Sequence, residues 1–161
     1  MANNLVYRPI GIARSPFVRQ AGTPVQPTYA ATVKGMLEIE EEYALALKDL
    51  DGFERIWVLY HFNRAGPYQA MVVPYHDDTP HGLFATRAPG RPNPIGISVV
   101  KLLSVKGTCL EVEGLDLLDG TPLLDLKPYI PEFDAFSPSR TGWLANGRRR
   151  TTADSRFEDE S

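Results

Sequence analysis

The chain has 161 residues and a formal net charge of −3, which is enough length for one domain of ordinary size. Its 13 Gly and 14 Pro residues argue against a helical bundle or a long coiled coil, because both residue types weaken helix interiors. The seven Phe, seven Tyr and two Trp exclude a disordered chain, and a single cysteine, Cys109, excludes a disulfide scaffold or a cysteine-ligated zinc site.

Nothing at the start of the sequence predicts export or membrane insertion. The first residues, MANN, lack the charged stretch and apolar core of a signal peptide. The longest apolar run covers residues 56–60, far short of the roughly 20 residues that span a bilayer. A lone thiol suits a reducing compartment. We therefore expect a cytoplasmic protein without a membrane partner.

The predicted elements are mostly short strands. In chain order they cover residues 7–14, 35–39, 55–62, 70–73, 97–105, 108–112, 115–118 and 123–126, the last two joined by an Asp-Gly turn. One helix is expected over residues 41–50, where apolar side chains recur behind three Glu. Because strands and helices do not alternate, the sequence predicts a mainly β, non-Rossmann fold. We expect a small β-barrel-like domain with one short helix over residues 1–145, followed by a polar, flexible tail over 146–161.

Two long loops, residues 15–32 and 74–96, are candidates for function, since long ordered loops inside compact domains tend to be functional. The sequence has no Walker loop, no G-x-G-x-x-G after a strand and no G-x-S-x-G elbow, so a doubly wound nucleotide site is not expected. His76 and His81 flank Asp77 and Asp78, but histidines scattered among prolines are mostly surface residues. We expect no metal.

The densest polar segment is HGLFATRAPGRPNPIG, residues 81–96, which places Arg87, Arg91 and Asn93 on a stiff, irregular backbone. Backbone groups that such a loop leaves unpaired can bind a polar ligand, although a purely structural crossover is the alternative. A second segment, residues 114–129, sets Asp116 and Asp125 among leucines. Each carboxylate needs a partner there, and either a ligand or Lys127 could supply it.

Four motifs in this order, PIGIARSPF, LDGFERIWVLYHF, HGLFATRAPGRPNPIGIS and LDLLDGTPLLDLKPY, resemble the TsaA/TrmO-like family. The resemblance covers about residues 7–134. It implies a small β-barrel that forms homodimers and binds S-adenosylmethionine. It also implies methyl transfer to N6 of the threonylcarbamoyl-modified adenosine next to the anticodon of tRNA. The net charge alone predicts no nucleic-acid partner, but basic residues gather in residues 55–106 and 140–150.

The resemblance also implies which residues bind the cofactor. Carried over by motif, they are Pro27, Thr28, Tyr29, Asn63, Arg64, Arg87, Ile97, Glu113, Gly114, Leu115 and Asp116.

The catalytic candidates come from chemistry and not from the family. An exocyclic adenine amine is a weak nucleophile, so an acceptor for its hydrogen would help, and Asn93 and Asp125 are the candidates. Lys127 and Tyr129 could orient Asp125 or the base. Arg91 is the candidate for binding the threonylcarbamoyl carboxylate. Two other functions stay open: a methyltransferase of the same fold acting on another RNA or a small molecule, and a non-catalytic S-adenosylmethionine-binding protein.

Overall fold

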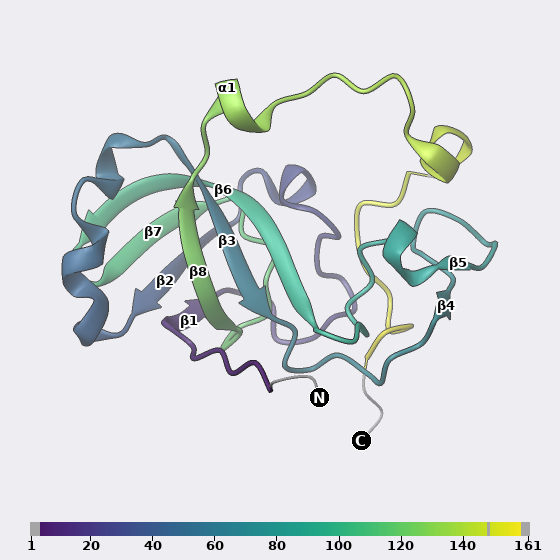
Figure 1. Cartoon of the computed structure of the whole chain (residues 1–161), viewed down its shortest axis with the longest axis horizontal. Helices are drawn as coiled ribbons and strands as arrows, with labels where there is room; N and C mark the ends of the chain where they lie inside the picture. The colour runs from purple at the N-terminus through teal and green to yellow at the C-terminus, as the bar shows by residue number, and fades with distance from the viewer. Residues whose placement is uncertain (1–3, 148, 159–161) are drawn as a thin grey trace.

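The computed structural model describes residues 4–147 and 149–158, and six strands close into a barrel (Figure 1). Around the barrel the strands run β1 (Gly11–Arg14), β2 (Lys34–Ile39), β7 (Cys109–Glu113), β6 (Ile95–Lys106), β3 (Arg55–His61) and β8 (Pro122–Pro128). Every neighbouring pair is antiparallel, including β1 and β8, whose pairing completes the circle. The predicted fold class, a small and mainly β barrel, is confirmed.

The remaining elements are short and lie outside the barrel. A separate two-stranded sheet is formed by β4 (Met71–Val72) and β5 (His81–Gly82). The helical turns are η1 (Pro27–Ala30), η2 (Glu41–Leu47), η3 (Leu50–Gly52), η4 (Leu83–Ala85), η5 (Gly142–Asn146) and the single α-helical turn α1 (Pro131–Asp134). The β4–β5 sheet and η5 lie to one side of the barrel (Figure 1).

The core fills the barrel because the strands alternate between inward and outward side chains. On β3, Ile56, Val58 and Tyr60 are buried while the residues between them are half-buried. This period of two is expected where one face of a sheet packs on a core. Fully buried side chains from six segments meet inside: Leu37, Ile56, Leu110, Leu115, Leu123, Val58, Val100 and Val112.

The helix expected over residues 41–50 is wrong in type, because the segment forms the 3-10 turns η2 and η3. Leu47 is buried in the core, Tyr43 and Leu50 are partly buried against it, and Leu45 is 85% exposed, so only part of the apolar stripe packs on the barrel. The chain also leaves the helical conformation at Lys48 (ψ 134°) and turns left-handed at Asp49 (φ 67°).

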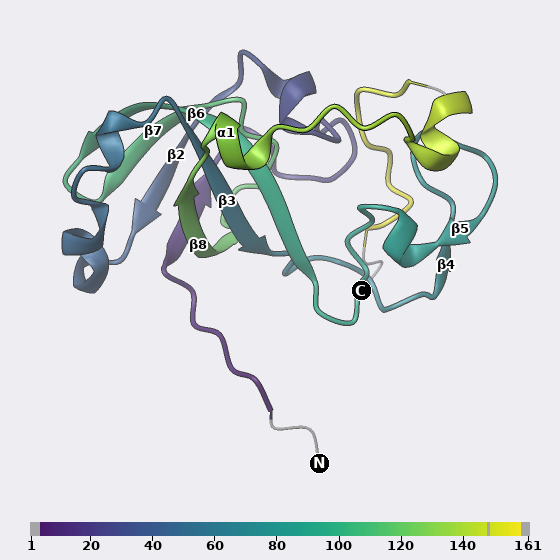
Figure 2. The ribbon, with the colours of Figure 1, turned by 45° about the horizontal axis from the view of Figure 1, so that its top comes forward.

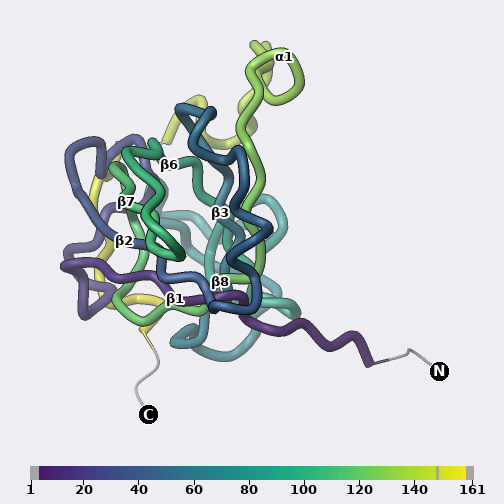
Figure 3. Tube along the Cα trace, turned by 90° about the vertical axis from the view of Figure 1, so that its left-hand side faces the viewer, coloured from purple at the N-terminus to yellow at the C-terminus, as the bar shows by residue number. Residues whose placement is uncertain are grey.

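The strand expected over residues 115–118 is also wrong. β7 ends at Glu113, and Gly114 adopts a positive φ of 87° that turns the chain out of the sheet. Leu115 enters the core, and the residues after it cross the end of the barrel without pairing. The Asp-Gly turn exists, but it precedes β8 and does not join a hairpin. Likewise the first strand begins at Gly11. Ile10 still contacts the barrel, where its amide donates to the Leu123 carbonyl, and the residues before it extend away (Figures 2 and 3).

The segment expected to be a tail, residues 146–161, includes Arg148 and residues 159–161, which lie outside the described residues. Its described part runs back between the barrel and the β4–β5 sheet (Figures 1 and 2). It forms isolated β-bridges between Thr152 and Pro24 and between Glu158 and Ala65. Its flexibility stays a prediction. Within the described part of the chain, no helix has the length and apolar character needed to cross a membrane.

Candidate ligand-binding site

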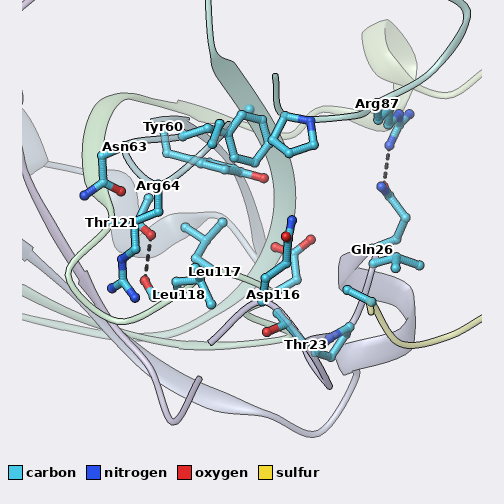
Figure 4. A pocket seen from close by; sticks show the side chains of 18 of the residues that line it. Thr23, Gln26, Tyr60, Asn63, Arg64, Arg87, Asp116, Leu117, Leu118 and Thr121 are labelled. Atoms are coloured by element: carbon cyan, nitrogen blue, oxygen red, sulfur yellow. Dashed lines mark hydrogen bonds between the residues drawn. The ribbon is translucent and has the colours of Figure 1, made fainter. Parts of the chain in front are cut away.

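A cavity of about 640 Å³ lies at the end of the barrel where β3 ends and β6 and β8 begin (Figure 4). Its wall is built from four stretches that surround this end, residues 18–26, 60–65, 86–97 and 116–121, together with Tyr75, Ala153 and Glu158. The volume lies within the range of pockets that enclose small ligands and cofactors.

A buried polar cluster joins the barrel interior to the cavity. The Ser98 hydroxyl lies 2.7 Å from Oδ1 of Asp116 and 3.4 Å from the Tyr60 hydroxyl. Burial raises the pKa of Asp116 from 3.8 to about 6, and the hydrogen bond from Ser98 opposes that rise. Burial, assisted by the charge of Asp116, also raises the pKa of the Tyr60 hydroxyl. A buried carboxylate with one hydroxyl donor is suited to accept further hydrogen bonds from a ligand.

One wall of the cavity is aromatic. Tyr60 and Phe62 meet edge to face with ring centroids 5.1 Å apart. The Tyr60 ring packs directly over Gly96 on the neighbouring strand, where a Cβ would overlap the ring carbons. Glycine at this position therefore sets how deep the tyrosine lies. Ile97, 45% exposed, extends the apolar surface.

Four arginines line the cavity, and their existing contacts differ. Nη2 of Arg19 lies 3.7 Å from Oε2 of Glu158, another residue of the wall. Arg64 donates to the carbonyls of Val18 and Asp119. Arg91 donates through Nη1 to the carbonyls of Thr86 (3.1 Å) and Ala88 (3.2 Å), and it lies over the Phe84 ring, 5.6 Å from the centroid.

Arg87 differs from these three, because the acceptor of its Nη1 is the side-chain amide of Gln26 (Figure 4). A carboxylate ligand is a stronger acceptor than an amide. Of the four guanidinium groups, that of Arg87 is therefore the best placed to bind an anion, because Arg19 already faces a carboxylate and the other two donate to backbone carbonyls.

The cavity also contains an acceptor without a donor. Oε1 of Gln20 is buried, and no described residue donates a hydrogen bond to it. Gln20 belongs to the cavity wall. An unsatisfied buried oxygen of this kind costs folding free energy.

Six of the residues expected to bind a ligand line the cavity: Asn63, Arg64, Arg87, Arg91, Ile97 and Asp116. The other cofactor candidates lie just beyond it. Pro27, Thr28 and Tyr29 form η1, and the wall is instead made by the three residues before them, Pro24, Val25 and Gln26. Glu113, Gly114 and Leu115 precede the residues of that segment that reach the cavity, Asp116, Leu117, Leu118 and Thr121.

These offsets have a physical cause. The chain turns at Gly114, where an added Cβ would lie 3.7 Å from the carbonyl oxygen of Pro27. The next side chain, Leu115, is fully buried in the core. The two segments that were expected to bind the cofactor, residues 27–29 and 113–115, therefore lie close to each other behind the cavity wall. Neither segment has a periodic sequence pattern from which the residues that face the cavity could be predicted. The length of the first loop was the only signal for Gln20 and Gln26.

The four catalytic candidates do not line the cavity. Asn93 is exposed, and its carbonyl accepts the amide of Ile95. Asp125 and Lys127 form an ion pair on β8, with Nζ and Oδ2 2.9 Å apart. This contact raises the pKa of Lys127. Tyr129 packs on Trp57, ring centroids 5.7 Å apart. Thus Lys127 is the partner of Asp125, whereas Asp116 is paired with Ser98.

In the second long loop, His81 makes contacts with other side chains of the protein. Nε2 of His81 lies 2.7 Å from Oδ2 of Asp77, and the His81 ring stacks on Trp143 with centroids 4.6 Å apart. Over residues 4–147 and 149–158, no group of three or more His, Cys, Asp or Glu is arranged to hold a metal ion.

The closed six-stranded barrel, with a buried acid and several arginines at one open end, defines a small ligand-binding barrel. The chain belongs to the tRNA-methyltransferase O N-terminal domain family, whose model matches residues 12–135. This finding confirms the family indicated by the four motifs.

Three similar proteins illustrate the family. A probable S-adenosyl-L-methionine-binding protein of Pyrococcus abyssi is 50% identical over 140 residues, which cover 87% of this chain and 76% of the relative. The tRNA (adenine(37)-N6)-methyltransferase of Mus musculus is 38% identical over 141 residues, 83% of this chain and 33% of the mouse protein. The crystal structure of TrmO from Pseudomonas aeruginosa superposes with a TM-score of 0.75 at 37% identity, covering 89% of this chain and 62% of that one. The chain therefore spans only part of these longer proteins.

Proposed function

We propose that the chain binds S-adenosylmethionine in the cavity and transfers its methyl group to N6 of adenosine 37 of tRNA. The observation that carries the proposal is that one cavity is lined both by the largely buried acid Asp116, bonded to Ser98, and by Arg87, whose side-chain partner is the neutral amide of Gln26. Relatives named as S-adenosyl-L-methionine-binding proteins and as tRNA (adenine(37)-N6)-methyltransferases support it.

The groups around the cavity fit the parts of this cofactor. Asp116 accepts hydrogen bonds from hydroxyl or ammonium groups. Arg87 exchanges the Gln26 amide for the cofactor carboxylate. The wall of Tyr60 and Ile97 packs on apolar and aromatic parts. When bound, the cofactor supplies a methyl group on a positively charged sulfur.

The protein's own contribution to transfer is to hold the acceptor amine in line with that methyl group. In the proposed mechanism, Asn93 and Asp125 accept hydrogen bonds from N6, and Lys127 and Tyr129 orient Asp125. The N–C bond forms as the S–C bond breaks, S-adenosylhomocysteine is the leaving group, and the extra proton on N6 passes to water. All four lie outside the cavity, so the modified base would meet them from the outer surface. Both hydrogen bonds of Arg91 use Nη1, which leaves the rest of its guanidinium for the threonylcarbamoyl carboxylate.

A homodimer in the cytoplasm is part of the same proposal. An apolar side chain, Phe84, is 78% exposed and lies against Arg91 of the cavity wall. A second copy covering it would bury this surface.

The test is methyl transfer in vitro from isotopically labelled S-adenosylmethionine to tRNA taken from a strain that lacks the gene, followed by mapping of the label. We expect label on N6 of the threonylcarbamoyl-modified adenosine, with or without a chelator, because no metal is required. Label on another RNA or on a small molecule would favour a different substrate for the same fold. Binding without any transfer would favour a non-catalytic binding protein.

A further inference from the structure

The last described residues, 150–158, are named here the strap. The strap lies outside the 12–135 segment that the family model matches, yet Ala153 and Glu158 belong to the cavity wall. In two views the strap passes between the barrel and the β4–β5 sheet (Figures 1 and 2). A segment in this position can affect ligand binding without being part of the barrel.

The strap pairs with the loop that forms one side of the cavity. The Gly22 amide donates to the Ala153 carbonyl (2.9 Å), the Ala153 amide to the Thr23 carbonyl (2.7 Å), and the Val25 amide to the Thr151 carbonyl (3.1 Å). These three backbone hydrogen bonds hold the loop just before Gln26. Since Gln26 accepts from Arg87, the strap fixes the position of a residue that contacts the proposed carboxylate anchor.

Arg156 fastens the strap to the rest of the protein. Its Nε lies 2.8 Å from Oδ1 of Asp154, and its Nη2 lies 2.7 Å from Oδ2 of the same carboxylate. Its Nη1 donates to the carbonyls of Val73 (3.2 Å) and Pro74 (2.9 Å). The guanidinium also lies over the ring of Tyr75, 5.2 Å from its centroid, and Tyr75 itself lines the cavity. A planar guanidinium is needed to make all these contacts at once.

The far end of the strap is held by Glu158. Its Oε1 accepts the Ala21 amide at 3.0 Å, its Oε2 lies 3.7 Å from Nη2 of Arg19, and its backbone bridges to Ala65. The strap therefore joins the two sides of the cavity, the loop of residues 18–26 and the end of β3.

We propose that the strap is a wall of the ligand site and that Arg156 is a positioning residue for S-adenosylmethionine. Arg156 does not line the cavity. It sets cofactor affinity by holding the strap in place, because Ala153 and Glu158 of the strap are part of the wall and the strap's backbone hydrogen bonds hold the loop of residues 22–25. The inference rests on the proposed function, because the ligand is the cofactor assigned there.

The experiment is a calorimetric titration with S-adenosylhomocysteine of the full chain and three variants. Arg156→Ala should weaken binding by tenfold or more. Arg156→Lys should restore only part of the affinity, because an ammonium group keeps the charge but cannot make the several hydrogen bonds of the planar guanidinium. Arg149→Ala is the matched control. Arg149 is exposed and has no hydrogen bond or ion pair among the described residues, so affinity should not change.

Amide hydrogen exchange of the unmodified protein keeps the test independent of variant folding. Added S-adenosylhomocysteine should slow exchange at Gly22, Val25 and Ala153 in addition to the barrel end. Wild-type affinity in Arg156→Ala, or unchanged exchange at these three amides, would overturn the strap proposal while cofactor binding stands. Failure of the wild-type protein to bind would instead overturn the proposed function, and the strap proposal with it.

Discussion

The burial of Asp116 lowers the stability of the folded protein when its carboxyl group is charged, and it places that group in the wall of the cavity. Its pKa in the folded protein is about 6, above its usual 3.8, so the folded state holds this proton more tightly than the unfolded state does. Protonated Asp116 therefore contributes to the free energy of unfolding. This contribution is complete below about pH 4 and is lost as pH rises through 6, which lowers the free energy of unfolding by roughly 2–3 kcal/mol. Asp116→Asn should therefore become more stable relative to wild type as pH rises from 4 to 7, in urea unfolding at each pH. A stability difference that does not change with pH would contradict the assigned environment.

Gly96 tests the aromatic wall. Gly96→Ala should destabilise the protein by about 1–3 kcal/mol, because the new Cβ would overlap the Tyr60 ring and force it out of position. Cofactor affinity should fall with it. Gly82→Ala is the control, since nothing lies within 4 Å of its Cβ position and its φ is −58°. Thermal unfolding curves of the two variants compare them directly. Equal melting temperatures for both variants would count against this packing.

At the scale of single residues, the sequence was enough to single out charged side chains that line the cavity, among them Arg87 and Asp116. It could not find Gln20 or Gln26. A neutral amide in a loop without a period carries no signal until the fold places it beside an arginine or leaves its oxygen buried.

Among the elements, β8 carries the ion pair that was expected to serve catalysis. Lys127→Ala should leave the affinity for S-adenosylhomocysteine unchanged, because Lys127 does not line the cavity. If the pair orients the base as proposed, turnover on tRNA should fall at least tenfold while the KM for the cofactor stays constant. Unchanged turnover would remove β8 from the mechanism.

The strands were predictable from the sequence where they alternate around a buried core, as in β3 and β6. Two predictions failed where tertiary context decides. Residues 41–50 have helical spacing, but the chain leaves the helical conformation at Lys48 and turns left-handed at Asp49. Residues 115–118 are as apolar as a strand but follow the left-handed Gly114. Neither condition is visible in a local pattern.

For the whole molecule, the sequence predicts a homodimer, and the exposed side chain of Phe84 supports that proposal. Light scattering should give a mass near twice that of the 17.9 kDa chain. Phe84→Asp should shift the population toward the monomer, because it places a charge in the proposed interface. A mass of one chain at all concentrations would contradict the dimer.

The cavity as an S-adenosylmethionine site is the central claim, and calorimetric titration of the cofactor into wild type and Arg87→Ala tests it most directly. We expect one site per chain in the wild-type protein, with binding weakened by about 1.5–3 kcal/mol when the charged hydrogen bond of Arg87 is removed. Absence of heat and of any thermal shift at millimolar cofactor would contradict the claim. So would an Arg87→Ala variant that binds as tightly as wild type.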